Sequence, residues 1–187
     1  MNTLRHIAYH GTSYENSVHI MCFGFKDEVG SIPNDLGHGI YAYIKREGYT
    51  DDPEENAKRY AEAYRNSRRG TVILKLQTVV KEDNILNLND PENEKILNDF
   101  YQKNYDKIEK RIQILYKENS EKPHFLRGNF DGIVLEMFLN NFDINPDAII
   151  MDTFTNYKII KEYKISNINN GREICIRNKN IIEVISK

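Results

Sequence analysis

A short apolar-leaning run near the N-terminus predicts a strand that leads into a helix. The strand covers Ile7 to His10, and Gly-Thr-Ser follows it. Ser13 or Thr12 then offers the side-chain oxygen that caps a helix over Tyr14 to Met21, because such a cap satisfies a free amide of the first turn. The chain is therefore expected to begin with a strand, a turn and a helix.

Further strands are predicted where apolar residues alternate or β-branched residues are concentrated. Thr71 to Gln77 is rich in β-branched residues and places Val72, Leu74 and Leu76 on one face. The other expected strands are Ile40–Ile44, Ala148–Met151 and Lys158–Ile165, with a final hairpin of Glu173–Arg177 and Ile181–Ile185 around Asn178-Lys179-Asn180.

Helices are predicted between these strands. Pro53, with acidic residues on both sides, starts a helix that runs to about Asn66 and stops at Gly70. Pro91 to Asn119 has apolar residues at helical spacing and forms one long helix or a pair, and Gly132 to Phe142 forms another helix.

This arrangement predicts an α+β fold with a mainly antiparallel sheet and flanking helices. The length of 187 residues fits a single domain, 1–187, with a helical insertion at about 91–145. With 26 basic and 28 acidic side chains, the chain carries no charge footprint of bulk nucleic-acid binding.

Cysteine content and hydropathy narrow the expected compartment. Cys22 and Cys175 are too few for a disulfide framework or a cysteine-based zinc site. No run of about 18 apolar residues occurs, so we expect neither a signal peptide nor a membrane span. The expected location is the cytoplasm.

Several motifs that hold nucleotides or metals are absent from the sequence. There is no G-x-G-x-x-G and no G-x-x-x-x-G-K-[ST], so a nucleotide would have to be held in another way. The five histidines show no metal-binding spacing, and no G-x-S-x-G occurs. We therefore expect no metal.

Three separated segments stand out instead. They are Tyr9-His10-Gly11-Thr12-Ser13, then Leu36-Gly37-His38-Gly39-Ile40-Tyr41 with Ala57-Lys58-Arg59-Tyr60-Ala61, and finally Asn170-Gly171-Arg172-Glu173-Ile174-Cys175-Ile176. In order and character these segments resemble the His-Tyr-Glu class of ADP-ribosyltransferases, which includes the diphtheria-toxin-like and poly(ADP-ribose)-polymerase-like enzymes. The resemblance implies a split β-sandwich around an NAD-binding cleft, with NAD+ as co-substrate.

The resemblance also implies a role for each matching residue. Glu173 would bond the hydroxyl of the nicotinamide ribose, His10 the adenosine ribose, and Gly11 the carboxamide through its backbone. Tyr41 and Tyr60 would stack on the nicotinamide. The implied catalytic residues are Glu173, His10 and Tyr41, and the implied NAD-binding residues are His10, Gly11, Thr12, Tyr41 and Tyr60.

The chemistry expected of Glu173 has a physical basis. Releasing nicotinamide from NAD+ passes through an oxocarbenium-like state, so a carboxylate beside the ribose gains interaction energy as positive charge develops. Alternation along the strand puts Glu173, Cys175 and Arg177 on one face, while Ile174 and Ile176 face the core. Aromatic faces favour the cationic pyridinium ring, which suits a pair of tyrosines.

The sequence departs from the family pattern at two positions. Asn56 stands where the family often has a serine that bonds the carboxamide, and Tyr60 lies at a slightly different spacing from the preceding alanine. The arginine-modifying cholera-toxin-like signature is absent.

Other roles for these residues stay open at this point. His10 could be a partly buried histidine bonded to a neighbouring carbonyl, and Tyr41 a core aromatic. Asp131 and Glu136 compete with Glu173 as the required carboxylate. The basic cluster Arg65, Arg68 and Arg69 suits a helix C-terminus, with contact to a phosphate as the alternative.

The resemblance implies an NAD+-dependent mono-ADP-ribosyltransferase that modifies an intracellular protein or nucleic acid, as a toxin or phage-conflict effector. With water as acceptor it would be an NAD+ glycohydrolase. A neutralising partner protein would fit either role. The alternatives are a non-catalytic member of the fold that binds a nucleotide or protein as an inhibitor or sensor, and a helix-rich interaction protein with chance motif matches.

Overall fold

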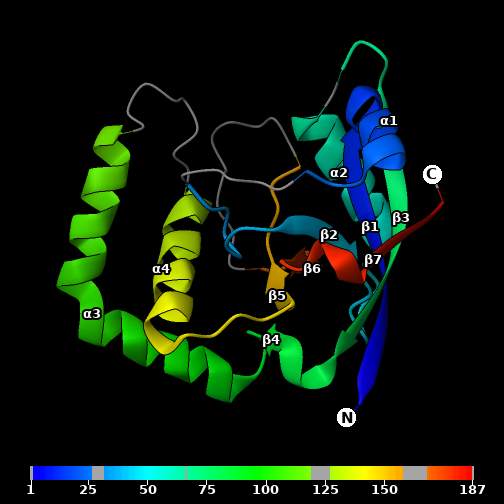
Figure 1. Ribbon diagram of the computed structural model, residues 1–187. Coiled ribbons are helices and arrows are strands. Elements are labelled where there is room, and N and C mark those ends of the chain that lie inside the picture. The colour runs from blue at the N-terminus through cyan, green and yellow to red at the C-terminus, as the bar shows by residue number, and fades with distance from the viewer. Residues whose placement is uncertain (1, 27–31, 66, 119–126, 158–167, 187) are drawn as a thin grey trace.

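A computed structural model describes residues 2–26, 32–65, 67–118, 127–157 and 168–186. Within these ranges the strands form one open sheet in the order β4-β5-β6-β2-β1-β3-β7 (Figure 1). The strands are β1 (Thr3–Ser13), β2 (Ile40–Ile44), β3 (Thr71–Lys81), β4 (Ile85–Asn87), β5 (Ala148–Thr153), β6 (Gly171–Ile176) and β7 (Ile182–Ser186). Only β4 and β5 pair in parallel among the described pairs, so the expected α+β class with a mainly antiparallel sheet is confirmed.

Four α-helices accompany the sheet in the described ranges. They are α1 (Tyr14–Phe23), α2 (Pro53–Tyr64), α3 (Pro91–Glu118) and α4 (Arg127–Phe142), with 3-10 turns at Glu82–Asn84 and Lys179–Ile181. Ser13 caps α1 by accepting the Asn16 amide, and Asp52 caps α2 by accepting the Glu54 amide at 2.9 Å. Ser13 is one of the two caps that the sequence offers for α1, and α2 begins at Pro53 as the sequence predicts.

Two apolar cores pack against the sheet. The first joins Ile20 of α1 to residues from the middle of the sheet, including Leu74, Leu76 and Ile174. The second joins α3 and α4 to β5 and β6 through Ile149 and Cys175. Figure 1 shows α3 and α4 standing beside each other, away from α1 and α2. The helices α3 and α4 thus form a layer against the sheet. In the chain they come between β4 and β5, the region where the sequence predicts a helical insertion.

Several predicted boundaries are corrected by the structure. The expected final hairpin is wrong: β6 pairs with β2 and β5, whereas β7 pairs with β3 at the far edge of the sheet. The 3-10 turn that Asn178 caps redirects the chain between the two strands. The predicted strand Lys158–Ile165 lies outside the described residues, and the short β4 was not predicted.

The end of α2 also differs from the prediction. The helix stops at Tyr64, where the Arg65 amide bonds the Ala61 carbonyl, so Gly70 is not its stop signal. Gly70 has φ 85° in the turn that enters β3, and its carbonyl accepts the Tyr14 amide at 3.1 Å. The region from Pro91 is a single long helix.

Candidate functional site

His10 lies where β1 and β2 separate. The two strands pair at Ala8 with Ile44 and at Tyr9 with Tyr43, and the His10 imidazole then bonds the Tyr41 carbonyl through Nδ1 at 2.7 Å. A carbonyl only accepts, so Nδ1 carries the hydrogen and Nε2 of the neutral ring is left as an acceptor. The side chain thus replaces a ladder hydrogen bond at this position.

The surroundings of His10 favour its neutral form. Burial lowers the pKa of His10, the bond to the Tyr41 carbonyl opposes this, and the positive charge of Arg65 lowers the pKa further. The ring edge of Phe25 packs against the imidazole with the centroids 5.3 Å apart. The bond to a carbonyl is the one expected of a structural histidine, and only Nε2 is left to serve a ligand.

Gly11 and Thr12 hold helix α2 close to β1. A Cβ atom at Gly11 would lie 2.0 Å from the Ala57 carbonyl oxygen, and Thr12 is only 3% exposed. The sequence suggested that glycine follows His10 so that a ligand can approach the backbone. The structure gives another reason, because it is α2 that approaches there.

Tyr41 braces the loop that precedes β2. Its hydroxyl donates to the Gly37 carbonyl at 2.8 Å and accepts the Leu36 amide at 2.9 Å, and its ring packs against the second core. Burial raises the pKa of the Tyr41 phenol. Tyr41 therefore behaves as the core aromatic that the sequence left open, while its carbonyl holds His10.

Glu173 sits in the middle of the sheet. Its cross-strand partners are Tyr43 on β2 and Met151 on β5, and the residue is only 7% exposed. Strand alternation puts the Tyr41 side chain on the same face as Glu173, whereas His10 shares the face of its partner Leu74. Tyr41 therefore connects the other two residues, through its backbone to His10 and through its side chain to the face of Glu173.

The carboxyl of Glu173 is held in its protonated form. Burial and the negative charge of Asp35 raise the pKa of Glu173 to about 8, although the hydroxyls of Thr153 and Tyr43 oppose the rise. A pKa of about 8 favours the protonated acid at neutral pH.

Asp35 is the acidic residue that the sequence reasoning missed. Its Oδ1 accepts the Leu36 amide at 3.2 Å, in a loop that α4 holds through a 2.6 Å bond from Asn129 Nδ2 to the Pro33 carbonyl. Burial raises the pKa of Asp35 to about 6, opposed by the Leu36 amide and assisted by the charge of Asp131. The Asn-Asp pair in the sequence indicated only a turn, because the burial comes from α4.

Glu136, one of the two competing acids, has a different task. It pairs with Arg177 at 2.5 Å and 3.2 Å and accepts the His38 amide at 2.7 Å. Burial acts to raise the pKa of Glu136, but Arg177 and the His38 amide lower it overall. Glu136 therefore fixes the loop around Gly37. Asp131, the other competitor, is exposed and acts on Asp35 through its charge.

Tyr60 on α2 is influenced by Arg65 and by the acids Glu173 and Asp35. Burial raises the pKa of Tyr60, Arg65 lowers it through its charge and a hydrogen bond, and the charges of Glu173 and Asp35 raise it. The guanidinium of Arg65 donates to the Tyr60 hydroxyl at 3.3 Å. Tyr60 thus interacts with a basic group and with both buried acids.

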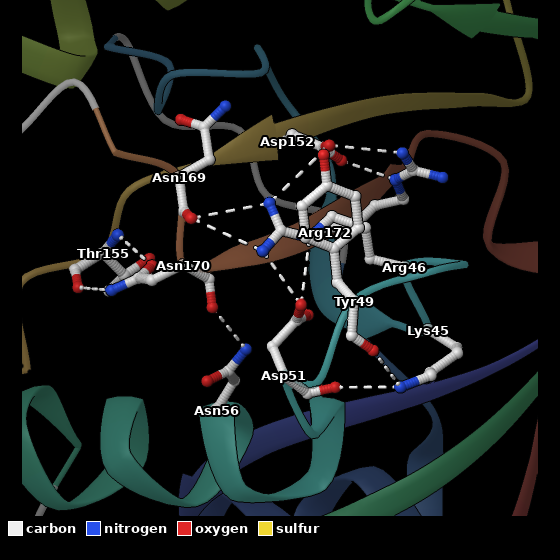
Figure 2. A network of polar contacts seen from close by, with 10 residues as sticks. All are labelled: Lys45, Arg46, Tyr49, Asp51, Asn56, Asp152, Thr155, Asn169, Asn170 and Arg172. Carbon is white, nitrogen blue, oxygen red and sulfur yellow. Dashed lines mark hydrogen bonds and ion pairs between the residues drawn. The ribbon is translucent and has the colours of Figure 1, made fainter.

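A polar network anchors the start of β6, next to Glu173. Figure 2 shows Asn56 Nδ2 donating to the Asn170 carbonyl, and the Asn170 side chain bonding the Thr155 backbone in both directions. Asn56 is buried and pins β6 to α2, so the residue in the family's serine position is engaged within the fold.

The same network contains buried ion pairs. Arg46 bonds Asp51 at 2.9 Å and stacks on Tyr49 with its guanidinium carbon 3.8 Å from the ring centroid, and Asp152 lies between Arg46 and Arg172 (Figure 2). These contacts tie the ends of β2, β5 and β6 together, so the backbone that carries Glu173 is firmly held.

Two surface hollows lie outside this cluster. One of about 440 Å³ is lined by Tyr9, Lys45 and the start of α2, and one of about 350 Å³ lies between α3 and α4. Neither lining includes His10, Tyr41 or Glu173. The candidate site therefore consists of the half-buried His10 and Tyr41, where β1 and β2 part, and of the buried Glu173 on the neighbouring strand β6.

Comparison of the sequence with known protein families, and separately with curated proteins, gave no match. In the part of the chain that the structure describes, no helix has the length and apolar character needed to cross a bilayer. The same described residues contain no group of three or more histidine, cysteine or acidic side chains placed to bind a metal ion.

Proposed function

We propose that the chain binds NAD+, cleaves its nicotinamide–ribose bond and transfers ADP-ribose to an intracellular macromolecule. The observation that supports this best is the position of His10, Tyr41 and Glu173 on three neighbouring strands, in the order β6-β2-β1. A bond from His10 to Tyr41 links two of them, and Tyr41 shares its face of the sheet with Glu173. These are the residues on which the resemblance to the His-Tyr-Glu class depends.

The chemistry proposed for Glu173 agrees with its surroundings. A buried acid that keeps its proton near neutral pH is stabilised as a carboxylate when a positive charge is placed beside it. The pyridinium of NAD+ supplies such a charge in the ground state, and the ribose supplies it as the bond breaks. Glu173 would then interact more strongly with the transition state than with free ribose.

His10 and Tyr60 would hold the rest of the dinucleotide. Nε2 of His10 is left to accept a ribose hydroxyl, and the ring of Tyr60 lies on the α2 side near Glu173. The parting of β1 and β2 beyond Tyr9 corresponds, in this proposal, to the split of the β-sandwich and to the NAD-binding cleft.

The test compares Glu173→Gln with the wild type in an assay of nicotinamide release from NAD+. The substitution keeps the side-chain shape but removes the ionisable group, so release should fall by about a hundredfold or more. Glu62→Gln is the matched control, because Glu62 is an exposed acid on the nearby helix α2. Circular dichroism and thermal melting would verify that both variants fold.

The outcomes separate the rival functions. Unchanged release by Glu173→Gln would refute the catalytic role of this acid. If the wild type binds NAD+ in calorimetry without releasing nicotinamide, the non-catalytic binding protein is the better description. Absence of any thermal stabilisation by millimolar NAD+ would favour an interaction protein with chance motif matches.

A further inference from the structure

The candidate site has a basic end and an acidic end. The half-buried Asp35 acts through its charge on the buried Glu173, and the charges of both act on Tyr60. Arg65 donates to the Tyr60 hydroxyl, and its positive charge acts on both Tyr60 and His10. A ligand that spans these residues would meet carboxyls at one end and a guanidinium at the other.

Arg65 is held differently from its basic neighbours on α2. Lys58 and Arg59 both pair with Glu55, at 3.9 Å and 3.0 Å. Arg65 instead donates from Nη2 to the Tyr60 hydroxyl, and its guanidinium carbon lies 5.8 Å from the centre of that ring. Within the described ranges of the chain, no carboxylate forms an ion pair with Arg65.

We propose that Arg65 binds the pyrophosphate of a dinucleotide, so that the site recognises the phosphates as well as the two riboses. This inference rests on the proposed function, because it places the nicotinamide end at Glu173 and the adenosine end at His10. A guanidinium presents several donors in one plane and matches the oxygens of phosphate with two parallel hydrogen bonds. The single bond to Tyr60 orients the group and leaves other donors for the ligand.

Charge complementarity favours this assignment over a purely local role for Arg65. A cation at the end of a helix is stabilised by the helix dipole wherever its side chain points. The Arg65 side chain, however, turns back to Tyr60, five residues earlier, and its charge influences the part-buried His10. NAD+ carries its positive ring and its negative pyrophosphate in the same order as the carboxyls and the guanidinium of the site.

The experiment measures binding of ADP-ribose by calorimetry, which needs no catalysis. Arg65→Gln should weaken the wild-type affinity by about tenfold or more, since hydrogen bonds to charged groups are among the stronger ones. Arg68→Gln is the matched control, because Arg68 is an exposed arginine just beyond the same helix and makes the same change of charge. Its affinity should stay within about twofold of the wild type, as expected for an exposed surface charge screened by salt.

A second measurement keeps chemistry and binding apart. Inorganic pyrophosphate should compete with ADP-ribose in the wild type and lose this effect in Arg65→Gln. Equal ADP-ribose affinity in Arg65→Gln and the wild type would overturn the inference while leaving the proposed function intact. Loss of ADP-ribose binding in Arg65→Gln, in a chain that releases no nicotinamide, would uphold the phosphate site and reject the proposed reaction. A wild type that binds neither ADP-ribose nor pyrophosphate would overturn the inference as well.

Discussion

Burial and a neighbouring acid act on Glu173 in the same direction. Both raise the pKa of Glu173, and Asp35 is itself shifted to about 6 by burial. The charge of this pair at a given pH therefore differs from that of two surface carboxyls. Because the proposed reaction needs Glu173 as a carboxylate, the protonation of the pair should govern both activity and stability.

Activity should rise with pH. For the free enzyme, kcat/KM for nicotinamide release is expected to increase with pH, and the midpoint of this increase should lie near pH 8, where Glu173 loses its proton. Asp35→Asn removes the neighbouring negative charge, so the midpoint should move to lower pH. A pH profile of kcat/KM for both proteins measures the shift.

The control for this prediction is Asp131→Asn. The charge of Asp131 raises the pKa of Asp35 but is not among the causes that shift the pKa of Glu173. This variant should therefore leave the midpoint almost in place. A midpoint that is identical in the wild type and Asp35→Asn would contradict the coupling between Asp35 and Glu173.

Stability should change with pH in the opposite sense. Between the ordinary pKa of 4.5 and about 8, folded Glu173 keeps a proton that the unfolded chain has lost. Unfolding therefore releases a proton, and raising the pH through this window favours unfolding. The Tm of the wild type should fall by roughly 5 °C more than that of Glu173→Gln between pH 6 and pH 8.5, and should level off above that. Parallel thermal melts that show the same slope for both proteins would exclude the shifted acid.

Single residues were predictable where a side chain acts through local chemistry. The sequence located His10, Tyr41 and Glu173 at strands, and the structure brings these strands together. Asp35 and the loop-fixing role of Glu136 were not predictable, because both depend on α4 packing against a loop about a hundred residues earlier in the chain.

At the scale of elements, the contact of α2 with β1 sets the geometry of the site. It depends on the missing side chain at Gly11, since a Cβ there would overlap the Ala57 carbonyl. The same helix carries Tyr60 and pins β6 through Asn56. A small change at Gly11 should therefore be felt across the whole cluster.

Gly11→Ala is expected to lower the free energy of unfolding by about 3 kcal/mol or more, because backbone must move to admit the methyl group. Urea denaturation measures the loss. Gly24→Ala is the control: Gly24 has φ 76° and ψ −179° but open space around it, so only its glycine-type backbone conformation costs energy there, about 1–3 kcal/mol. Equal losses in the two variants would show that α2 yields easily.

Elements were predictable where local signals are strong, as at the cap Ser13, at Pro53 and along the periodic segment of α3. The final hairpin failed for a tertiary reason. Two adjacent strands with a short connection suit a hairpin locally, yet β6 is already paired on both edges by β2 and β5. In the described sheet β7 pairs instead with the edge of β3, and sequence spacing carries no information on that choice.

At the scale of the whole molecule, the two cores share β5 and β6. Cys175 belongs to the second core and is fully buried, whereas Cys22 on α1 is exposed. Burial raises the pKa of the Cys175 thiol, which further suppresses its reactivity. One thiol should therefore react quickly with a thiol reagent, and the other only when the fold opens.

Labelling of Cys175 can show whether the chain unfolds as one unit. Leu135→Ala in the second core and Leu74→Ala in the first should each cost about 2–5 kcal/mol, as both side chains are fully buried. If the layers are cooperative, both variants should speed Cys175 labelling in proportion to their loss of stability. Faster labelling in Leu135→Ala alone would mean that the helices α3 and α4 detach separately from the sheet.

The protonated acid in the sheet has a consequence for calorimetry. When a cationic ligand binds beside Glu173, the carboxyl group should release its proton, which the buffer then takes up. The heat recorded on mixing would then depend on which buffer receives it. Titrations in phosphate and in Tris at pH 7 should differ by the difference in ionisation heat of the two buffers, multiplied by the number of hydrogen ions released.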